Sequence, residues 1–108
     1  MTAQYTPQFT ITQVDPTRYR VTGELDMASA PTLHEAMRPV VEATGGLTLV
    51  LDGLTFIDSY GLRSLVELSS ELNGSGPLVL SDISPSVQRV LDIVGIETLP
   101  GIEIRDDG

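Results

Sequence analysis

The stretch from Leu47 to Leu72 constrains the fold more than any other part of the sequence. It opens with an almost unbroken apolar run, 47–51, typical of a strand that is central in a sheet or covered on both faces. A short polar loop around 58–61 follows, and apolar residues then recur at the spacing of an amphipathic helix. The predicted inner face of this helix consists of Leu62, Leu65, Val66, Ser69 and Leu72.

The loop places Ser59 at the predicted N-cap of this helix. Its hydroxyl can accept hydrogen bonds from the free backbone N–H groups of the first turn. The same groups and the helix dipole favour negative charge, so a phosphate would also suit this position. Gly61 has poor helix propensity, which indicates a close approach to the backbone or a bend. These residues alone leave two readings open: a capping serine beside the loop carboxylate Asp58, or a functional hydroxyl.

The remaining chain alternates predicted strands and helices. Residues 9–14 and 18–25 predict an antiparallel hairpin, preceded by a loose lead-in at 1–8. Helices are predicted from the cap Ser29 to about Ala43, from Ser59 to near Asn73-Gly74, and from the cap Ser84 to Gly95. The predicted inner face of the third helix comprises Val87, Val90, Leu91 and Val94.

Further short strands are predicted at 78–80 and within 96–104, before a polar tail at 105–108. This order indicates an α/β fold: a mixed sheet of about five strands, with the hairpin first and parallel strands after it, and three or more helices packed on the sheet. We expect a single domain over 1–108, with its core at about 9–104.

Composition narrows the classes of partner. Six arginines, no lysine and fifteen acidic residues give a net charge of -9, which repels nucleic-acid backbones and anionic membranes. No apolar run is long enough to span a bilayer, and the first residues lack the pattern of a signal peptide. The absence of cysteine excludes disulfides and fits a cytoplasmic protein. We therefore expect neither nucleic-acid nor membrane binding.

Candidate catalytic groups are few. A carboxylate-based hydrolase could use Glu24, Asp26 and Asp58, although the sequence does not show their separation. A nucleophilic pair of Ser59 with His34, the only histidine, lacks an evident orienting group, and His34 is expected on the solvent side. No spacing indicates a metal site, and no glycine-rich phosphate loop or lysine indicates a nucleotide site. The sequence therefore predicts a protein without catalytic residues, metal or cofactor.

Three motifs, in order, resemble the STAS domain family. They are residues 23–31 (GELDMASAP), 56–62 (FIDSYGL) and 83–95 (ISPSVQRVLDIVG). The resemblance covers roughly residues 9–104 and is closest to stand-alone bacterial anti-sigma factor antagonists. It implies a mixed α/β domain that binds proteins in partner switching, a form of transcription regulation.

The resemblance also implies roles for individual residues. The unphosphorylated antagonist would bind an anti-sigma factor that is also a serine kinase, and so free a sigma factor. Phosphorylation of Ser59 would block binding, a serine phosphatase would reset it, and ATP would belong to the partner. The phosphorylation site would be shaped by Asp26, Asp58 and Gly61. The partner-binding surface would comprise Glu24, Asp26, Met27, Ser59, Tyr60, Leu62 and Arg63.

Tyr60 departs from the family pattern, which often has a small serine or threonine there, and could anchor a partner or be a harmless exposed ring. The rival reading is a non-switching STAS scaffold, in a sensory or lipid-transport assembly, in which Ser59 only caps a helix.

Overall fold

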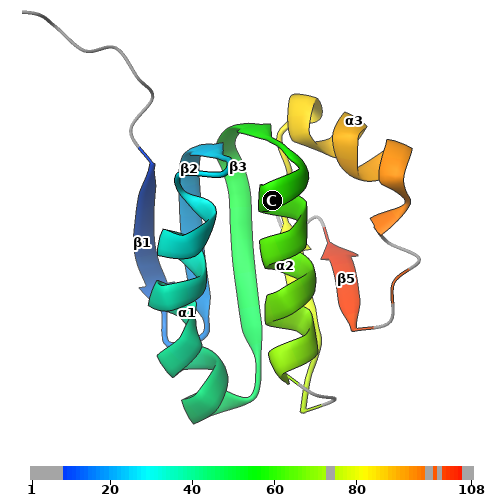
Figure 1. Ribbon diagram of the computed structural model, residues 1–108. Helices are drawn as coiled ribbons and strands as arrows, with labels where there is room; N and C mark the ends of the chain where they lie inside the picture. Colours follow the sequence, from blue (N-terminus) through cyan, green and yellow to red (C-terminus); the bar gives the residue numbers. More distant parts are fainter. Residues whose placement is uncertain (1–8, 73–74, 97–98, 100, 106–108) are drawn as a thin grey trace, which may run out of the picture.

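The described part of the chain is a five-stranded sheet with three helices (Figure 1). The computed structural model describes residues 9–72, 75–96, 99 and 101–105, so the predicted lead-in at 1–8, the helix end at 73–74 and residues 106–108 of the predicted tail lie outside it. The prediction that the tail begins at Arg105 was wrong, because Arg105 is the last residue of a strand. The strands are β1 (Thr10–Asp15), β2 (Arg18–Leu25), β3 (Leu47–Ile57), β4 (Leu78–Ser81) and β5 (Ile102–Arg105). The helices are α1 (Ala30–Thr44), α2 (Ser59–Leu72) and α3 (Pro85–Val94).

The strand order β1-β2-β3-β4-β5 confirms the predicted mixed sheet. The first two strands pair antiparallel as a hairpin, and each later neighbouring pair is parallel. The connections through α1 and α2 place these helices side by side on one face of the sheet (Figure 1). Consequently β2 and β3 end, and α1 and α2 begin, at the same end of the molecule. This end carries both loops from which the sequence predicts a site.

The core lies between the sheet and these two helices. Leu49 and Leu51 of β3 point into it and are fully buried, together with Leu33 and Met37 of α1. Burial of one such side chain stabilises the fold by roughly 1.5–3 kcal/mol relative to exposure. The position of β3 in the middle of the sheet confirms the interpretation of its apolar run.

The buried face of α2 differs from the predicted one. The predicted stripe was wrong at Val66, which is 41% exposed, and it missed Leu68, which is fully buried. The buried residues are Gly61, Ser64, Leu65, Leu68 and Leu72. Because α2 packs along α1 as well as on the sheet, its inner face is turned toward α1. In α3 the prediction was likewise wrong at Val94, which is exposed.

Strand β3 is longer than its apolar run indicates, because it continues through Gly53 to Ile57. A Cβ at Gly53 would lie 2.7 Å from Cγ2 of Thr22, so the glycine allows the two strands to approach there. The pairing with β2 shifts register beside this point and resumes up to Ile57. The extension carries the chain to Asp58, next to the end of β2.

The ends of α1 and α3 follow the predicted glycines. Gly45 and Gly95 adopt left-handed conformations, with φ of 70° and 68°. The predicted cap Ser84 stands at the N-cap position of α3, but its hydroxyl donates to the carbonyl oxygen of Leu54 and caps no N–H group. This serine instead fastens α3 to β3. No helix in the described ranges is long and apolar enough to cross a bilayer.

Candidate functional site

Two loops meet at the shared end of β2, β3, α1 and α2. Leu25 pairs with Ile57, and the N–H of Asp58 donates to the carbonyl oxygen of Leu25 at 3.2 Å. Gly61 lies directly against this junction, because a Cβ there would be 2.5 Å from the Leu25 oxygen and 2.8 Å from Cγ1 of Ile57. The close approach predicted from Gly61 is therefore confirmed.

Asp58 caps helix α2. Its Oδ1 accepts hydrogen bonds from the N–H groups of Tyr60 at 2.9 Å and Gly61 at 3.0 Å, the N2 and N3 positions that a capping side chain reaches. The prediction that Ser59 is the cap was wrong, because the helix begins at Ser59 and the cap is the residue before it. The side chain of Ser59 is exposed, and no described residue hydrogen-bonds to its hydroxyl.

Asp26 organises the loop that leads into α1. Its Oδ1 accepts from the N–H groups of Ala28 at 3.0 Å and Ser29 at 3.1 Å. The hydroxyl of Ser29, predicted as the cap, accepts from the N–H of Asp26 at 2.9 Å and donates to the carbonyl oxygen of Glu24 at 2.6 Å. Ser29 thus closes the loop and caps no helix N–H group. Both predicted site aspartates therefore bind backbone N–H groups through Oδ1.

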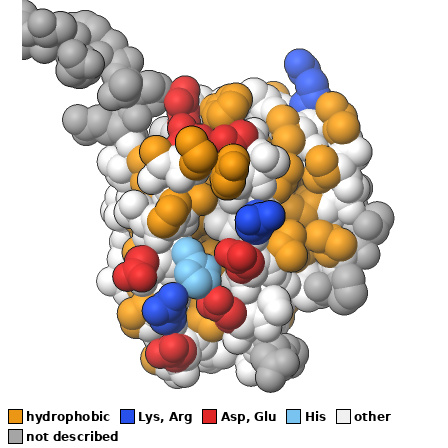
Figure 2. Space-filling view, viewed as in Figure 1, with side chains coloured by type: hydrophobic (Ala, Val, Ile, Leu, Met, Phe, Trp, Pro, Cys, Tyr) orange, Lys and Arg blue, Asp and Glu red, His pale blue; other side chains and the backbone are white. Residues whose placement is uncertain are grey.

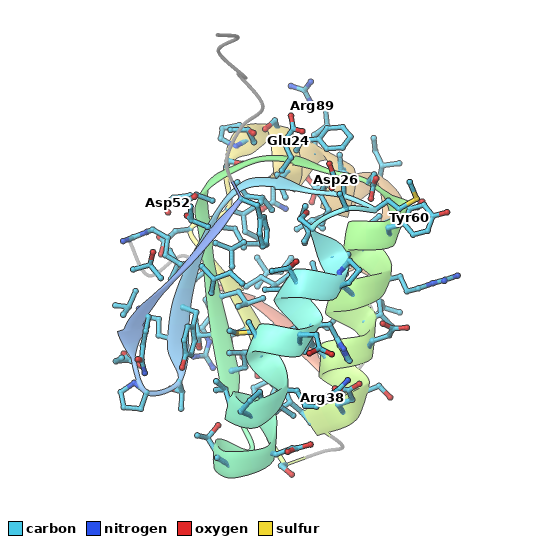
Figure 3. All side chains as sticks on the ribbon, turned by 60° about the vertical axis from the view of Figure 1, so that its left-hand side comes forward. Glu24, Asp26, Arg38, Asp52, Tyr60 and Arg89 are labelled. Carbon is cyan, nitrogen blue, oxygen red and sulfur yellow. The ribbon has the colours of Figure 1, made fainter. Side chains whose placement is uncertain are left out.

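Several apolar side chains are exposed around Ser59. Met27 and Tyr60, both predicted contact residues, are 62% and 48% exposed, and Phe56 is 46% exposed. Figure 2 shows hydrophobic side chains gathered over the upper ends of α1 and α2, and Figure 3 shows Glu24, Asp26 and Tyr60 at that end. This end therefore offers an apolar surface edged by carboxylates.

The other predicted contact residues differ in exposure. Ser59 and Arg63 are exposed, while Glu24 and Asp26 are half-buried. Leu62 is also half-buried and packs against the core, so only part of its side chain is available to a partner.

A groove of about 310 Å³ runs between α1 and α2 from this surface. Three of its lining residues, Met27, Tyr60 and Arg63, were predicted as contact residues, and the others were not. The groove is lined by Met27, Ala30, Pro31, His34, Tyr60, Arg63, Ser64 and Glu67. Further along the helices, Nε2 of His34 lies 2.6 Å from Oε2 of Glu71. The His34 side chain is only 19% exposed, less than the sequence indicated. Because its Nε2 is engaged with Glu71, the structure does not pair it with Ser59.

Phe56 was also missed as a surface residue. It lies in the strand extension beyond Gly53, at the register of Glu24. Side chains alternate between the two faces of a strand, so Phe56 points away from the face that buries its neighbour Ile57. Had the strand been predicted to continue to Ile57, this alternation would have indicated that Phe56 is exposed.

Comparison with known proteins assigns the family. Residues 8–107 match the model of the STAS domain. The chain belongs to the STAS domain family. It is 30% identical over 89 residues to an anti-sigma-B factor antagonist of Bacillus subtilis (strain 168), covering 82% of each chain. It is 33% identical over 92 residues to an anti-sigma-B factor antagonist of Staphylococcus epidermidis, covering 83% of this STAS chain and 85% of the relative.

Solved structures share the STAS fold. An anti-sigma factor antagonist from Mycobacterium paratuberculosis matches with a TM-score of 0.73 at 24% identity, over 95% of this chain and 90% of its own. The anti-sigma factor antagonist SpoIIAA matches in its unphosphorylated form with a TM-score of 0.70 at 22% identity, over 90% of this chain and 87% of its own. The phosphorylated form of the Bacillus SpoIIAA matches with a TM-score of 0.64 at 20% identity, over 90% of each chain. Both forms of SpoIIAA therefore have the overall fold seen here.

Proposed function

We propose that this STAS protein is an anti-sigma factor antagonist, which binds an anti-sigma factor and thereby frees a sigma factor. Relatives of that name match more than four fifths of the chain at 30% and 33% identity. The observation that carries the proposal is the hydroxyl of Ser59. It lies exposed at the start of α2, while Asp58 does the work of the helix cap.

The regulation in this proposal is phosphorylation of Ser59 by the anti-sigma factor acting as a serine kinase, and removal of the phosphate by a serine phosphatase. An exposed hydroxyl that takes no part in the hydrogen bonding of the loop can enter a kinase active site without unfolding the helix. Asp26, Asp58 and Gly61 support the acceptor by fixing the two loops. The protein itself acts by binding, and the partner supplies ATP and magnesium.

The partner-binding surface in this proposal is the exposed end around Ser59. Met27 and Tyr60 are suited to be its anchors, because exposed large side chains beside a groove gain the most area when a partner covers them. A phosphate in the middle of such a contact adds about 1.5–2 negative charges that the partner must desolvate. A hundredfold loss of affinity requires only about 2.8 kcal/mol, and a like charge facing the phosphate can supply several kcal/mol.

The test is a binding and phosphorylation assay with the candidate anti-sigma kinases of the source genome. One of them should bind the purified chain, and with Mg-ATP it should add a single phosphate, seen by intact mass and mapped to position 59. Ser59→Ala should still bind but accept no phosphate. Ser70→Ala, which changes an exposed serine further along α2, is the matched control and should behave as the wild type.

The assay also decides against the alternative reading. If a partner binds stably but Mg-ATP neither modifies Ser59 nor releases it, the non-switching scaffold is favoured. If none of the candidate kinases binds the unphosphorylated chain, the antagonist role is rejected.

A further inference from the structure

Two backbone N–H groups at the start of α2, which could bind a phosphate on Ser59, already donate hydrogen bonds. The N–H groups of Tyr60 and Gly61, which the sequence offered to a phosphate, both donate to the carboxylate of Asp58. To use them, the phosphate would have to displace a like-charged group that already satisfies both donors. The half-buried carboxylate of Asp26 is held at the neighbouring helix start and adds further negative charge at this end. A phosphate on Ser59 would therefore be stabilised by a cation other than the helix N-terminus.

Arg63 is the basic residue nearest to Ser59 in the sequence and lies on the same helix. It lies four residues after Ser59 on α2, so the two side chains are neighbours on one helix face, with Cβ atoms about 5–6 Å apart. Helical side chains lean toward the N-terminus of their helix, which directs Arg63 over the turn that carries Ser59. The guanidinium group can then reach the phosphate oxygens with two parallel hydrogen bonds.

Arg63 is also available for this contact. It is exposed, and it forms no ion pair with any residue that the structure describes. Glu67 follows one turn later, but a basic residue before an acidic one is the less favourable order for an i, i+4 pair. In contrast, Arg20 and Arg105 are paired with carboxylates, at 3.1 and 2.9 Å.

We propose that Arg63 binds the phosphate group carried by Ser59, a refinement that rests on the proposed function. Phosphorylation then changes the surface in two ways. It adds negative charge at Ser59, and it draws away from the α1–α2 groove the arginine that lines it. A partner carboxylate that contacts Arg63 in the unphosphorylated complex would lose its cation and meet a phosphate.

The test uses phosphoserine incorporated at position 59 during translation, so that no kinase is needed. The titration of the phosphate, followed by ³¹P NMR, gives its second pKa, for which the ordinary value is about 6. Arg63→Gln should raise that pKa by roughly 0.4 pH unit or more, because the cation stabilises the dianion. The control is Arg38→Gln, an exposed arginine without an ion pair among the described residues, at the opposite end of the helices (Figure 3). It should leave the titration unchanged.

The amide signals of Tyr60 and Gly61 provide the second measurement. If Asp58 keeps its hydrogen bonds, these signals should show only the small shifts expected of residues next to a new charge, and no large downfield shift. Large shifts of both signals, with a titration unaffected by Arg63→Gln, would place the phosphate on the helix N-terminus and overturn the proposal. That outcome would leave the antagonist role intact, whereas a failed kinase assay would not affect the titration result.

Discussion

At the scale of single residues, the loop before α2 divides two tasks between Asp58 and Ser59. A serine that caps a helix holds its hydroxyl against backbone N–H groups, where a kinase must first release it. Here the carboxylate of Asp58 takes both N–H groups, and its charge also complements the positive end of the helix dipole. The hydroxyl of Ser59 is exposed and takes no part in capping the helix. The loop before α1 differs, because Asp26 there binds the N–H groups of Ala28 and Ser29, which precede the helix, and the hydroxyl of Ser29 is itself hydrogen-bonded within the loop.

This division predicts unequal costs for two neighbouring alanine substitutions. Asp58→Ala should lower the free energy of unfolding by about 1 kcal/mol, within a range of roughly 0.5–2, because a capping carboxylate is lost. Ser59→Ala should change it by less than about 0.5 kcal/mol, as for other exposed side chains without partners. Urea denaturation of the two variants and the wild type measures both values. A larger loss of stability in Ser59→Ala than in Asp58→Ala would indicate that Ser59 is the helix cap after all.

At the scale of elements, α2 is seated on the sheet through its first turn. Gly61 brings the helix backbone against the carbonyl oxygen of Leu25, at the last pair of residues that joins β2 to β3. The hydrogen bond from the Asp58 N–H to the same oxygen fixes the loop from the other side. The position of Ser59 is thus set by contact between three elements and does not depend on the loop alone.

Gly61→Ala tests this seating. Alanine is the better helix former by about 1 kcal/mol, so an unobstructed site would be stabilised. Here the new Cβ would stand 2.5 Å from a backbone oxygen, and we expect a net loss of about 1–3 kcal/mol, measured by urea denaturation. Gly46→Ala is the control, because a Cβ at Gly46 meets no atom within 4 Å, and it should cost less than about 0.5 kcal/mol. A stabilised Gly61→Ala protein would contradict the close approach.

The order and type of the elements could be predicted from the sequence. The spacing of apolar residues distinguishes helices from strands, and glycines mark the ends of helices. The length of β3 could not, since its continuation through Gly53 depends on the contact with Thr22. The buried face of α2 was also missed in part. Val66 and Leu68 are both apolar, and only the packing of α2 against α1 decides which of them is buried. Gly61 and Ser64 are buried but carry no hydrophobic signal. The exchange of roles between Asp58 and Ser59 required knowing the helix start to within one residue, which periodicity does not give.

At the scale of the whole molecule, the distribution of charge is compatible with the proposed switch acting without a change of fold. The net charge is -9, yet Arg38, Arg63 and Arg89 form no ion pair with any described residue. The core lies beneath the site, between the sheet and the two helices, and it contains no titratable side chain among the described residues. A charge added at the exposed end therefore meets surface groups and leaves the packed interior untouched.

Phosphorylation at Ser59 should consequently lower partner affinity while the backbone stays in place. We expect amide signals to shift for residues around 26–29 and 58–63, and to stay constant in β4 and β5, when ¹H–¹⁵N spectra of the two forms are compared. Affinity measured by calorimetry should fall at least about a hundredfold, which corresponds to about 2.8 kcal/mol. If signals from β4 and β5 moved as well, the charge would be acting through the core, and release would need a change of conformation. Shifts confined to the residues around Ser59, together with the loss of binding, are the result expected if phosphorylation blocks only the contact surface.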